Sequence, residues 1–362
     1  MSPSCKVCGL SMPLRLSLDA QAGGAGCVEV VEETRCLLPL LQDARLQIPV
    51  REVASGDSGE SAVFRVDVPW NLVMHRGLLR DLSCRGVTGV RDLVSCPHEF
   101  APPFSFEPIV VDSPLAKRKA ECALLRSLRK VQDGWTSTYL NRYISLFITR
   151  WLTYLPISPN QLSVGILAVG LFGAYLASLG TYWTIVLGAF LFQAQSVLDG
   201  CDGELSRVTY RGSLLGEWFD TVGDDLTNYG FFGGLAYGLY GATGSVAYLV
   251  AGGVVVGCGV LTSAIEYRYL IRIGSGDLLK YPLGIGKAPG SVRRKKGVVG
   301  LVVDLVSPLF KRDSFVFLTF LGALVGLAGS FLFVFAVGAL GIFVAVLGAE
   351  VRMFRERRGG RL

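Results

Sequence analysis

The chain has 362 residues, of which 51% are hydrophobic and 18% charged, and its mean hydropathy is +0.47. A chain this apolar is typical of an integral membrane protein with a soluble part, and it argues against a wholly soluble or a disordered chain. The net charge of +6 does not indicate a nucleic-acid partner. The basic residues cluster in short segments beside apolar stretches, where membrane orientation and anionic lipids explain them.

Residues 1–113 mix charge, proline and short apolar runs, which predicts a small cytosolic α/β domain. The expected strands lie near residues 28–32, 45–53, 62–69 and 107–112, and the expected helices near 33–42 and 71–83. The nine cysteines have no repeating spacing, so we expect free thiols. Cys5 and Cys8 are the one metal-like pair, and no second pair exists to complete a zinc site.

Residues 114–135 are expected to form a linker helix, followed by a membrane domain at 136–357 and a basic tail at 358–362. Early in the membrane domain, one face of a predicted helix collects Leu140, Tyr143, Ile144, Phe147 and Trp151. Such an amphipathic helix should lie in the membrane interface, with its aromatic rings at headgroup depth.

Pro156 and Pro159 end this amphipathic helix, and Asn160 can cap the helix that follows. Beyond it, six apolar stretches approach the roughly 20 residues needed to cross a bilayer, so we expect an all-α domain with about six transmembrane helices. These stretches are residues 161–180, 183–205, 215–239, 244–268, 314–329 and 332–352.

Lys and Arg are concentrated after the second stretch, after the fourth stretch and in the tail, whereas the opposite connections contain neither residue. By the positive-inside rule, the basic segments and both termini face the cytoplasm. We therefore expect a multi-pass protein, located in the inner membrane of the cell if the source is a bacterium.

Four aspartates stand in and beside the second and third stretches, in the pattern D-x-x-D-G-x-x-S-R-x8-G-x-x-x-D-x-x-x-D. Asp199 and Asp202 are three apart and Asp220 and Asp224 four apart, so each pair shares one face of its own helix. Two carboxylates in contact repel by about 4 kcal/mol at an effective dielectric near 20, so protons or cations must lie among them. Oxygen ligands suit Mg²⁺, Mn²⁺ or Ca²⁺, and Mg²⁺ is often held together with substrate phosphates. The motif predicts a divalent-metal site that acts on a phosphate ester.

Three other motif residues fit phosphate chemistry. Gly203 leaves room for a phosphate near the backbone, Gly216 opens the facing helix similarly, and Arg207 offers a planar clamp with several donors. The alternative for both glycines is that they only allow close helix packing. Asp225 follows Asp224 but points about 100° away around the helix, so it receives no role.

The whole pattern resembles the signature of the CDP-alcohol phosphotransferases, D-x-x-D-G-x-x-A-R-x7–8-G-x-x-x-D-x-x-x-D, with Ser206 in place of the alanine. The resemblance implies an integral membrane enzyme, forming a homodimer, that moves a phospho-alcohol group, phosphatidyl or phosphoinositol, from a CDP-alcohol to an acceptor hydroxyl and releases CMP. It also implies that Asp199, Asp202, Asp220 and Asp224 hold two divalent ions, Mg²⁺ or Mn²⁺, and that Asp224 is the base.

The same resemblance assigns further residues to the CDP-alcohol donor. These are Gly203, Arg207, Ser213 and Gly216 in the motif, and Asn160 and Ser163 in a Pro-Asn segment that resembles the start of the family's first span. For Asn160, a role as a simple helix cap has equal weight.

Several short segments resemble one branch of this family, the inositol-phosphate-transferring enzymes related to di-myo-inositol phosphate phosphate synthase. They are L-L-R-S-L-R-K at Leu124, D-G-W at Asp133, L-N-R-Y-I-S at Leu140 and L-D-G-C-D-G-E at Leu198. In that branch a nucleotidyltransferase-like domain can precede the membrane domain. Residues 1–113 are short for a complete one, and the glycine cluster at 22–26 lacks the basic residues of a phosphate loop. The domain is therefore either a reduced, non-catalytic relative or an unrelated α/β appendage.

The acceptor pocket is predicted from four cations. Arg268 and Arg272 share a helix face at i, i+4, and Lys311 and Arg312 open the fifth apolar stretch. These residues could hold a phosphate on the acceptor, which favours an inositol phosphate or a glycerol phosphate. Anchoring at the membrane edge explains any one of them slightly better.

Two other functions remain open. A divalent-cation transporter or metal-binding scaffold would use the aspartates to carry or hold ions, although the acids gather at one membrane edge and not near mid-membrane. A catalytically inactive relative would act through protein contacts of its N-terminal domain, although all four aspartates and Arg207 are present.

Overall fold

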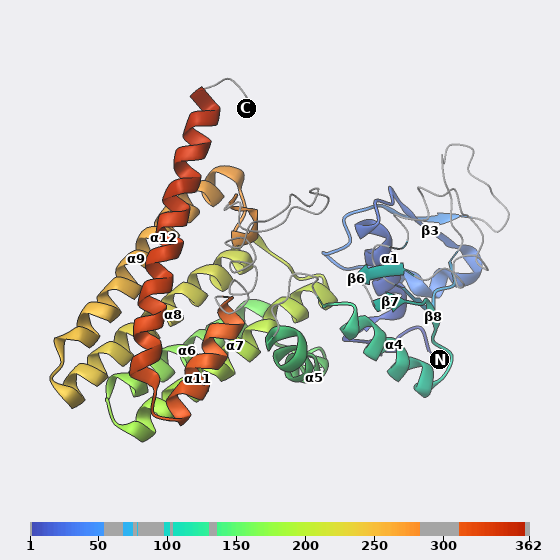
Figure 1. The fold of residues 1–362 in the computed structure, drawn as a ribbon. Coiled ribbons are helices and arrows are strands. Elements are labelled where there is room, and N and C mark those ends of the chain that lie inside the picture. Colours follow the sequence, from blue (N-terminus) through green and yellow to red (C-terminus); the bar gives the residue numbers. More distant parts are fainter. Residues whose placement is uncertain are drawn as a thin grey trace. The chain divides into compact units, whose positions relative to one another are not determined.

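The computed structural model describes residues 2–53, 68–74, 78, 98–101, 104–129, 136–282 and 311–358. It is mostly helical, with a small α/β region in the N-terminal part (Figure 1), as predicted. Contacts divide the chain into two compact units. The first comprises Met1–Asp133, Leu146–Ile157 and Gly203–Arg211, and the second Gly134–Ser145, Ser158–Asp202 and Gly212–Leu362.

The strands of the first unit pair two by two. The antiparallel pairs are β1 (Lys6–Val7) with β2 (Leu10–Ser11), β5 (Leu72–Val73) with β8 (Ile109–Val110), and β6 (His98–Ala101) with β7 (Phe104–Phe106). The parallel pair is β3 (Val28–Val31) with β4 (Val50–Val53), and the 3-10 helix η1 (Glu32–Leu41) lies in the crossover that a parallel pair requires. Two helices, α1 (Met12–Ala22) and α4 (Pro114–Arg126), complete the unit.

The sequence predicted part of this region. Strands were expected near 28–32, 45–53 and 107–112, where β3, β4 and β8 occur, and η1 occupies the helix expected near 33–42. The helix expected at 71–83 is wrong at its start, because Leu72 and Val73 form a strand that pairs with β8. Most of the rest of that helix lies outside the described residues, as do residues 62–67 of the strand expected near 62–69. Helix α1 was not predicted, because its leucines at 14, 16 and 18 alternate with polar residues, a spacing that does not indicate a helix.

The first unit encloses the last turn of α7 (Tyr182–Thr209), the helix that carries Asp199 and Asp202. Arg15 is only 2% exposed, and its Nη2 donates to the backbone oxygens of Val7 at 3.1 Å and Val208 at 3.0 Å. Arg45 donates to the backbone oxygen of Thr209 at 2.8 Å. The last carbonyls of a helix have no partner within the helix, and cations there favour its dipole. The two arginines therefore fix the C-terminal end of α7.

In the first unit, the side chains of Asp43 and Cys8 have shifted pKa values. Hydrogen bonds from the Arg45 side chain hold the pKa of Asp43 down at about 2, so the pair that presents Arg45 to α7 persists at all physiological pH values. Burial raises the pKa of the Cys8 thiol to about 12 although Arg15 opposes the shift, so Cys8 is a protonated thiol at neutral pH.

Replacement of Arg15 by alanine should lower the free energy of unfolding by roughly 3 kcal/mol or more, because buried carbonyl groups lose a charged donor. Thermal unfolding of the purified protein measures the loss. The matched control is Arg35→Ala, which removes an exposed arginine paired with Glu52 at 3.1 Å and should change little. Equal melting temperatures of the two variants would contradict the role given to Arg15.

The second unit is a helical bundle (Figure 1). Its long helices are α6 (Pro159–Ser178), α7, α8 (Leu214–Thr243), α9 (Val246–Ile273), α11 (Arg312–Leu324) and α12 (Ala328–Arg358). Helix α8 packs against α6 and α9, and α9 packs against α12. In the core, Phe192 of α7 stacks on Phe231 of α8 with ring centroids 4.4 Å apart.

Four helices are long and apolar enough to cross a membrane in the part of the chain that the structure describes: α6, α7, α9 and α12. The chain is therefore a membrane protein with four candidate spans, whereas six were expected. Helix α8 carries acids in its first half, and the 13 residues of α11 reach only about 20 Å at 1.5 Å per residue, short of a hydrocarbon core of about 30 Å. The predicted stretch 314–329 contains the turn between α11 and α12.

The segment predicted to form the amphipathic helix is helical, with the π-helical turn η2 (Ser137–Asn141) followed by α5 (Arg142–Leu152). Three of the five residues on its apolar face, Tyr143, Phe147 and Trp151, are 60 to 66% exposed. Its location in the membrane interface remains a prediction.

Helices α6 and α8 approach closely where small residues meet. A Cβ atom at Gly234 of α8 would lie 2.5 Å from the backbone oxygen of Ala174 of α6. At the next contact towards the acidic motif, a Cβ atom at Gly170 of α6 would lie 2.4 Å from Thr227 Cγ2 of α8. Small residues let membrane helices pack backbone to backbone, and here they bring the acidic half of α8 against α6.

The substitution Gly234→Ala should lower the free energy of unfolding by about 1–3 kcal/mol, because the added methyl group overlaps a backbone atom. Gly253→Ala in α9 is the control, since a Cβ atom there meets nothing within 4 Å. It should be neutral or stabilising, because alanine is the better helix former. Thermal unfolding in one detergent compares the two, and a melting temperature of Gly234→Ala at or above that of the natural chain would refute the packing argument.

Candidate metal and phosphate site

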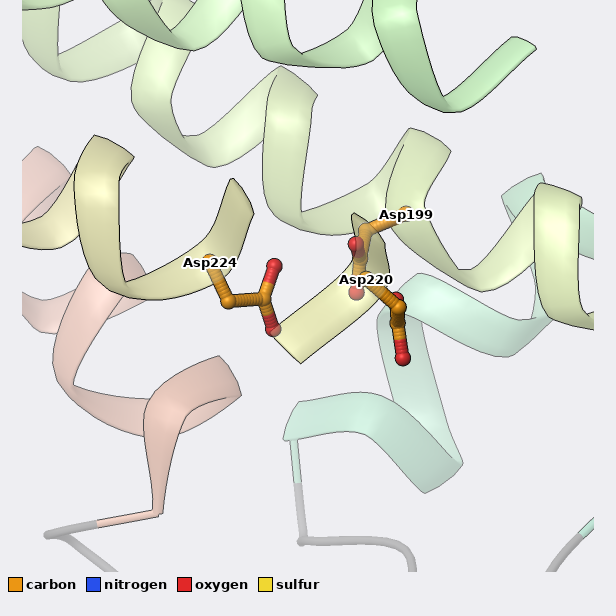
Figure 2. A group of neighbouring side chains, drawn as sticks. All are labelled: Asp199, Asp220 and Asp224. Carbon is orange, nitrogen blue, oxygen red and sulfur yellow. The ribbon is translucent and has the colours of Figure 1, made fainter. Parts of the chain in front are cut away.

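Three carboxylates converge between α7 and α8. One oxygen each of Asp199, Asp220 and Asp224 lie within 4.8 Å of one another, and Figure 2 shows the three side chains as neighbours. Asp220 is exposed and the other two are partly buried. Three carboxylate oxygens at this separation suit a hard divalent cation such as Mg²⁺ or Mn²⁺, so the residues fit the expected metal.

Asp202, the fourth aspartate of the motif, is not in this group of three. It is 5% exposed, and its Oδ2 accepts a hydrogen bond from Ser163 Oγ at 2.5 Å. Ser163 was expected near the donor substrate, and it joins α6 to α7 beside the acidic group.

Arg312 forms ion pairs with Asp199 and Asp224. Its Nη1 is 3.0 Å from Asp199 Oδ2 and 2.7 Å from Asp224 Oδ2, and its Nη2 donates to Gln195 Oε1 at 2.9 Å. The sequence interpretation placed Arg312 with an acceptor phosphate and did not consider Gln195. Gln195 is four residues before Asp199, so helical spacing alone could have placed it on the same face of α7.

The start of α8 brings three predicted donor residues together. Ser213 caps the helix, with its Oγ accepting from the backbone nitrogen of Gly216 at 3.0 Å. A Cβ atom at Gly216 would lie 3.3 Å from Asn160 Oδ1 of α6. The expected capping role of Asn160 is wrong, because Ser158 caps α6 and accepts from the backbone nitrogen of Gln161.

Gly203 and Arg207 lie one turn apart in the last part of α7, which belongs to the first unit. A Cβ atom at Gly203 would lie 3.1 Å from Arg207 Nη1, so the guanidinium extends along the glycine surface. A larger residue at 203 would displace Arg207, so the glycine keeps the arginine in this position.

The remaining predicted acceptor residues lie elsewhere. Arg268 of α9 pairs with Glu350 of α12 at 3.2 Å. Arg268 and Arg272 line a pocket of about 190 Å³ together with Tyr269, Glu350, Met353 and Phe354. Lys311 is exposed and directly precedes α11.

Asp225 is directed towards α9 and not towards the three carboxylates. Its Oδ2 accepts hydrogen bonds from Tyr267 Oη at 2.6 Å and from Ser263 Oγ. This orientation agrees with the expectation that Asp225 has no part in the metal site.

Comparisons with known proteins agree with this geometry. Residues 156–275, which include the whole acidic motif, match the family model described as CDP-alcohol phosphatidyltransferase. The resemblance predicted from the motif is confirmed for this part of the chain, and the matched family is one of transferases.

Individual relatives belong to the predicted branch. The chain is 37% identical over 127 residues to the "Bifunctional IPC transferase and DIPP synthase" of Aquifex aeolicus (strain VF5), covering 35% of this chain and 28% of that protein. Proteins of the same name in Thermococcus kodakarensis and Archaeoglobus fulgidus are 35% and 34% identical over 128 and 148 residues. These matches cover 35% and 40% of this chain, and 28% and 29% of the two relatives. The chain therefore matches less than a third of the length of each relative.

Replacement of Asp220 by asparagine should weaken Mn²⁺ binding by more than about tenfold, because one of three converging carboxylates loses its charge. Titration calorimetry on the purified protein without substrate measures the change. Glu266→Gln is the control, since Glu266 is a buried acid of α9 outside the group. An unchanged affinity in Asp220→Asn would exclude Asp220 from the metal site.

Proposed function

We propose that the chain is a membrane transferase that moves a phospho-alcohol group, phosphatidyl or phosphoinositol, from a CDP-alcohol to an acceptor hydroxyl and releases CMP. The observation that carries the proposal is the convergence of Asp199, Asp220 and Asp224 from two facing helices, within the segment that matches the family model. Neighbouring acids at helix ends need cations, and cations held by oxygen ligands serve phosphate chemistry.

In this proposal Asp199, Asp202, Asp220 and Asp224 hold two divalent ions, Mg²⁺ or Mn²⁺, which when bound neutralise the pyrophosphate and stabilise CMP as it leaves. Asp202 would join from its hydrogen bond with Ser163, which lies next to the group. We assign the CDP-alcohol donor to Gly203 and Arg207 on α7, to Asn160 on α6, and to Ser213 and Gly216 at the start of α8. Backbone exposed at the glycines and the planar guanidinium suit phosphate oxygens.

Asp224 takes the proton of the acceptor hydroxyl as the hydroxyl oxygen attacks the β-phosphorus of the donor. A new phosphorus–oxygen bond forms, and the bond between the β-phosphorus and the oxygen bridging to CMP breaks, with its electron pair leaving on CMP. The other residues bind and orient the two substrates, which is most of what phosphoryl transfer requires from a protein.

The relatives' name indicates the branch of the family. On this basis we propose two things for this chain. The transferred group is phosphoinositol, and the acceptor carries a phosphate. Arg268, Arg272 and Lys311 supply cations for such an acceptor at the ends of α9 and α11. The proposal also keeps the expected domains, with residues 1–113 as a cytosolic, reduced nucleotidyltransferase-like domain, 114–135 as a linker and 136–357 as a membrane domain with an interfacial helix. The assembly that we expect is a homodimer.

Replacement of Asp224 by asparagine should lower kcat for CMP release by at least about 10²-fold, the usual contribution of a positioned base. The assay supplies purified protein and Mg²⁺ or Mn²⁺ with a panel of CDP-alcohols and acceptors, and identifies the product by mass. Asp225→Asn is the matched control, because it makes the same change one residue away on a side chain directed to α9.

Two outcomes would contradict the proposal. Full turnover by Asp224→Asn would remove the base. Mn²⁺ flux into proteoliposomes in the absence of any nucleotide, with no CMP formed from any donor, would favour the cation transporter.

A further inference from the structure

Arg312 is bound to the oxygens that a metal ion would need. Its Nη1 bridges Asp199 Oδ2 and Asp224 Oδ2, one on each of the two facing helices, and its Nη2 is held by Gln195. The three charged side chains are each 20 to 22% exposed, so their interaction is only partly screened by solvent. Arg312 lies outside residues 156–275, so the match to the family model does not account for it.

The residues that follow Arg312 are held by contacts that do not involve the Arg312 side chain. Asp313 Oδ2 accepts from the backbone nitrogen of Ser137 at 2.7 Å, and Thr136 Oγ1 donates to Ser314 Oγ at 3.4 Å. These contacts fix the start of α11, so only the Arg312 side chain needs to rotate to leave the aspartates. Arg312 Nε is buried without a hydrogen-bond partner among the described residues, so the guanidinium is incompletely satisfied where it lies.

We propose that Arg312 is an internal counter-ion that competes with the divalent ion for Asp199 and Asp224 and leaves these carboxylates when the ion binds. The proposal rests on the proposed metal site. A Mg²⁺ ion binds carboxylate oxygens at about 2.0–2.1 Å, so an ion on these two oxygens would stand within contact range of the guanidinium. Two cations that close repel each other in a partly buried site, so the ion and Arg312 exclude each other there.

The exchange has a consequence for substrate. A guanidinium that leaves two carboxylates needs new acceptors, and its planar fork matches phosphate oxygens. Arg312 then becomes available to a substrate phosphate only after the metal has bound. The structure thus links two observations that the sequence kept apart, the metal site and the cation at the start of α11.

The first test is Mn²⁺ affinity, measured by titration calorimetry on the purified full-length chain without substrate. Competition predicts that Arg312→Gln binds Mn²⁺ about tenfold more tightly than the natural chain, because the ion no longer has to displace a charge. Arg312→Lys should bind with an intermediate affinity, since lysine keeps the charge and loses the fork. Arg150→Gln is the control; it removes an arginine paired with Glu121 at 3.3 Å in the first unit and should leave the affinity unchanged.

The second test compares thermal stability with a chelator and with saturating Mn²⁺. Without metal, Arg312→Gln should melt below the natural chain, because Asp199 and Asp224 lose their counter-ion. With Mn²⁺ the difference should disappear, because linkage requires that a residue displaced by a ligand no longer stabilises the bound form. A difference that stays the same size with Mn²⁺ would show that Arg312 remains on the aspartates, and would overturn the proposal.

The two hypotheses fail in distinguishable ways. If the natural chain binds Mn²⁺ and Arg312→Gln binds it equally or more weakly, the counter-ion role is wrong and the metal site stands. If the natural chain and the Arg312 variants all fail to bind Mn²⁺, the proposed metal site is wrong, and the competition falls with it.

Discussion

The repulsion among three carboxylates within 4.8 Å of one another is the constraint on which the candidate site depends. Like charges at that separation stay together only if cations offset them and if the helices that carry them cannot move apart. Arg312 supplies one positive charge. The helices are held by close packing, through Gly170 and Gly234 between α6 and α8 and through the stacked rings of Phe192 and Phe231 between α7 and α8. Cations offset the charge of the three carboxylates, and helix packing keeps the carboxylates close to one another.

Helix α7 carries this constraint along its length. Phe192 lies in the apolar core of the second unit, whereas the last turn of α7 is held in the first unit by Arg15 and Arg45. The N-terminal region therefore holds the last turn of α7 whether or not it has a catalytic activity of its own. This role needs only two arginines and a pair of carbonyl groups.

The sequence was informative where local spacing decides the outcome. Apolar stretches placed the long helices of the second unit, and intervals of three and four residues placed the aspartates on helix faces. It was less informative where distant segments meet. Nothing in the order of residues says that Ser163 donates to Asp202, or that Arg312 crosses to Asp199, because these contacts depend on how helices pack. The predicted stretch 314–329 extends past the end of α11 at Leu324, because hydropathy does not register the turn that follows.

The four cations assigned to the acceptor have different environments in the structure, and this changes how they can act. Arg312 is bound to carboxylates and is committed to the acidic group. Arg268 and Arg272 line a pocket in which, among its described lining residues, the one acid is Glu350, so in the proposed function an acceptor anion has two guanidinium groups opposed by a single carboxylate. In the proposed function, the acceptor phosphate would therefore bind at Arg268 and Arg272 in preference to Arg312. This preference would last until a metal ion releases Arg312 from the aspartates.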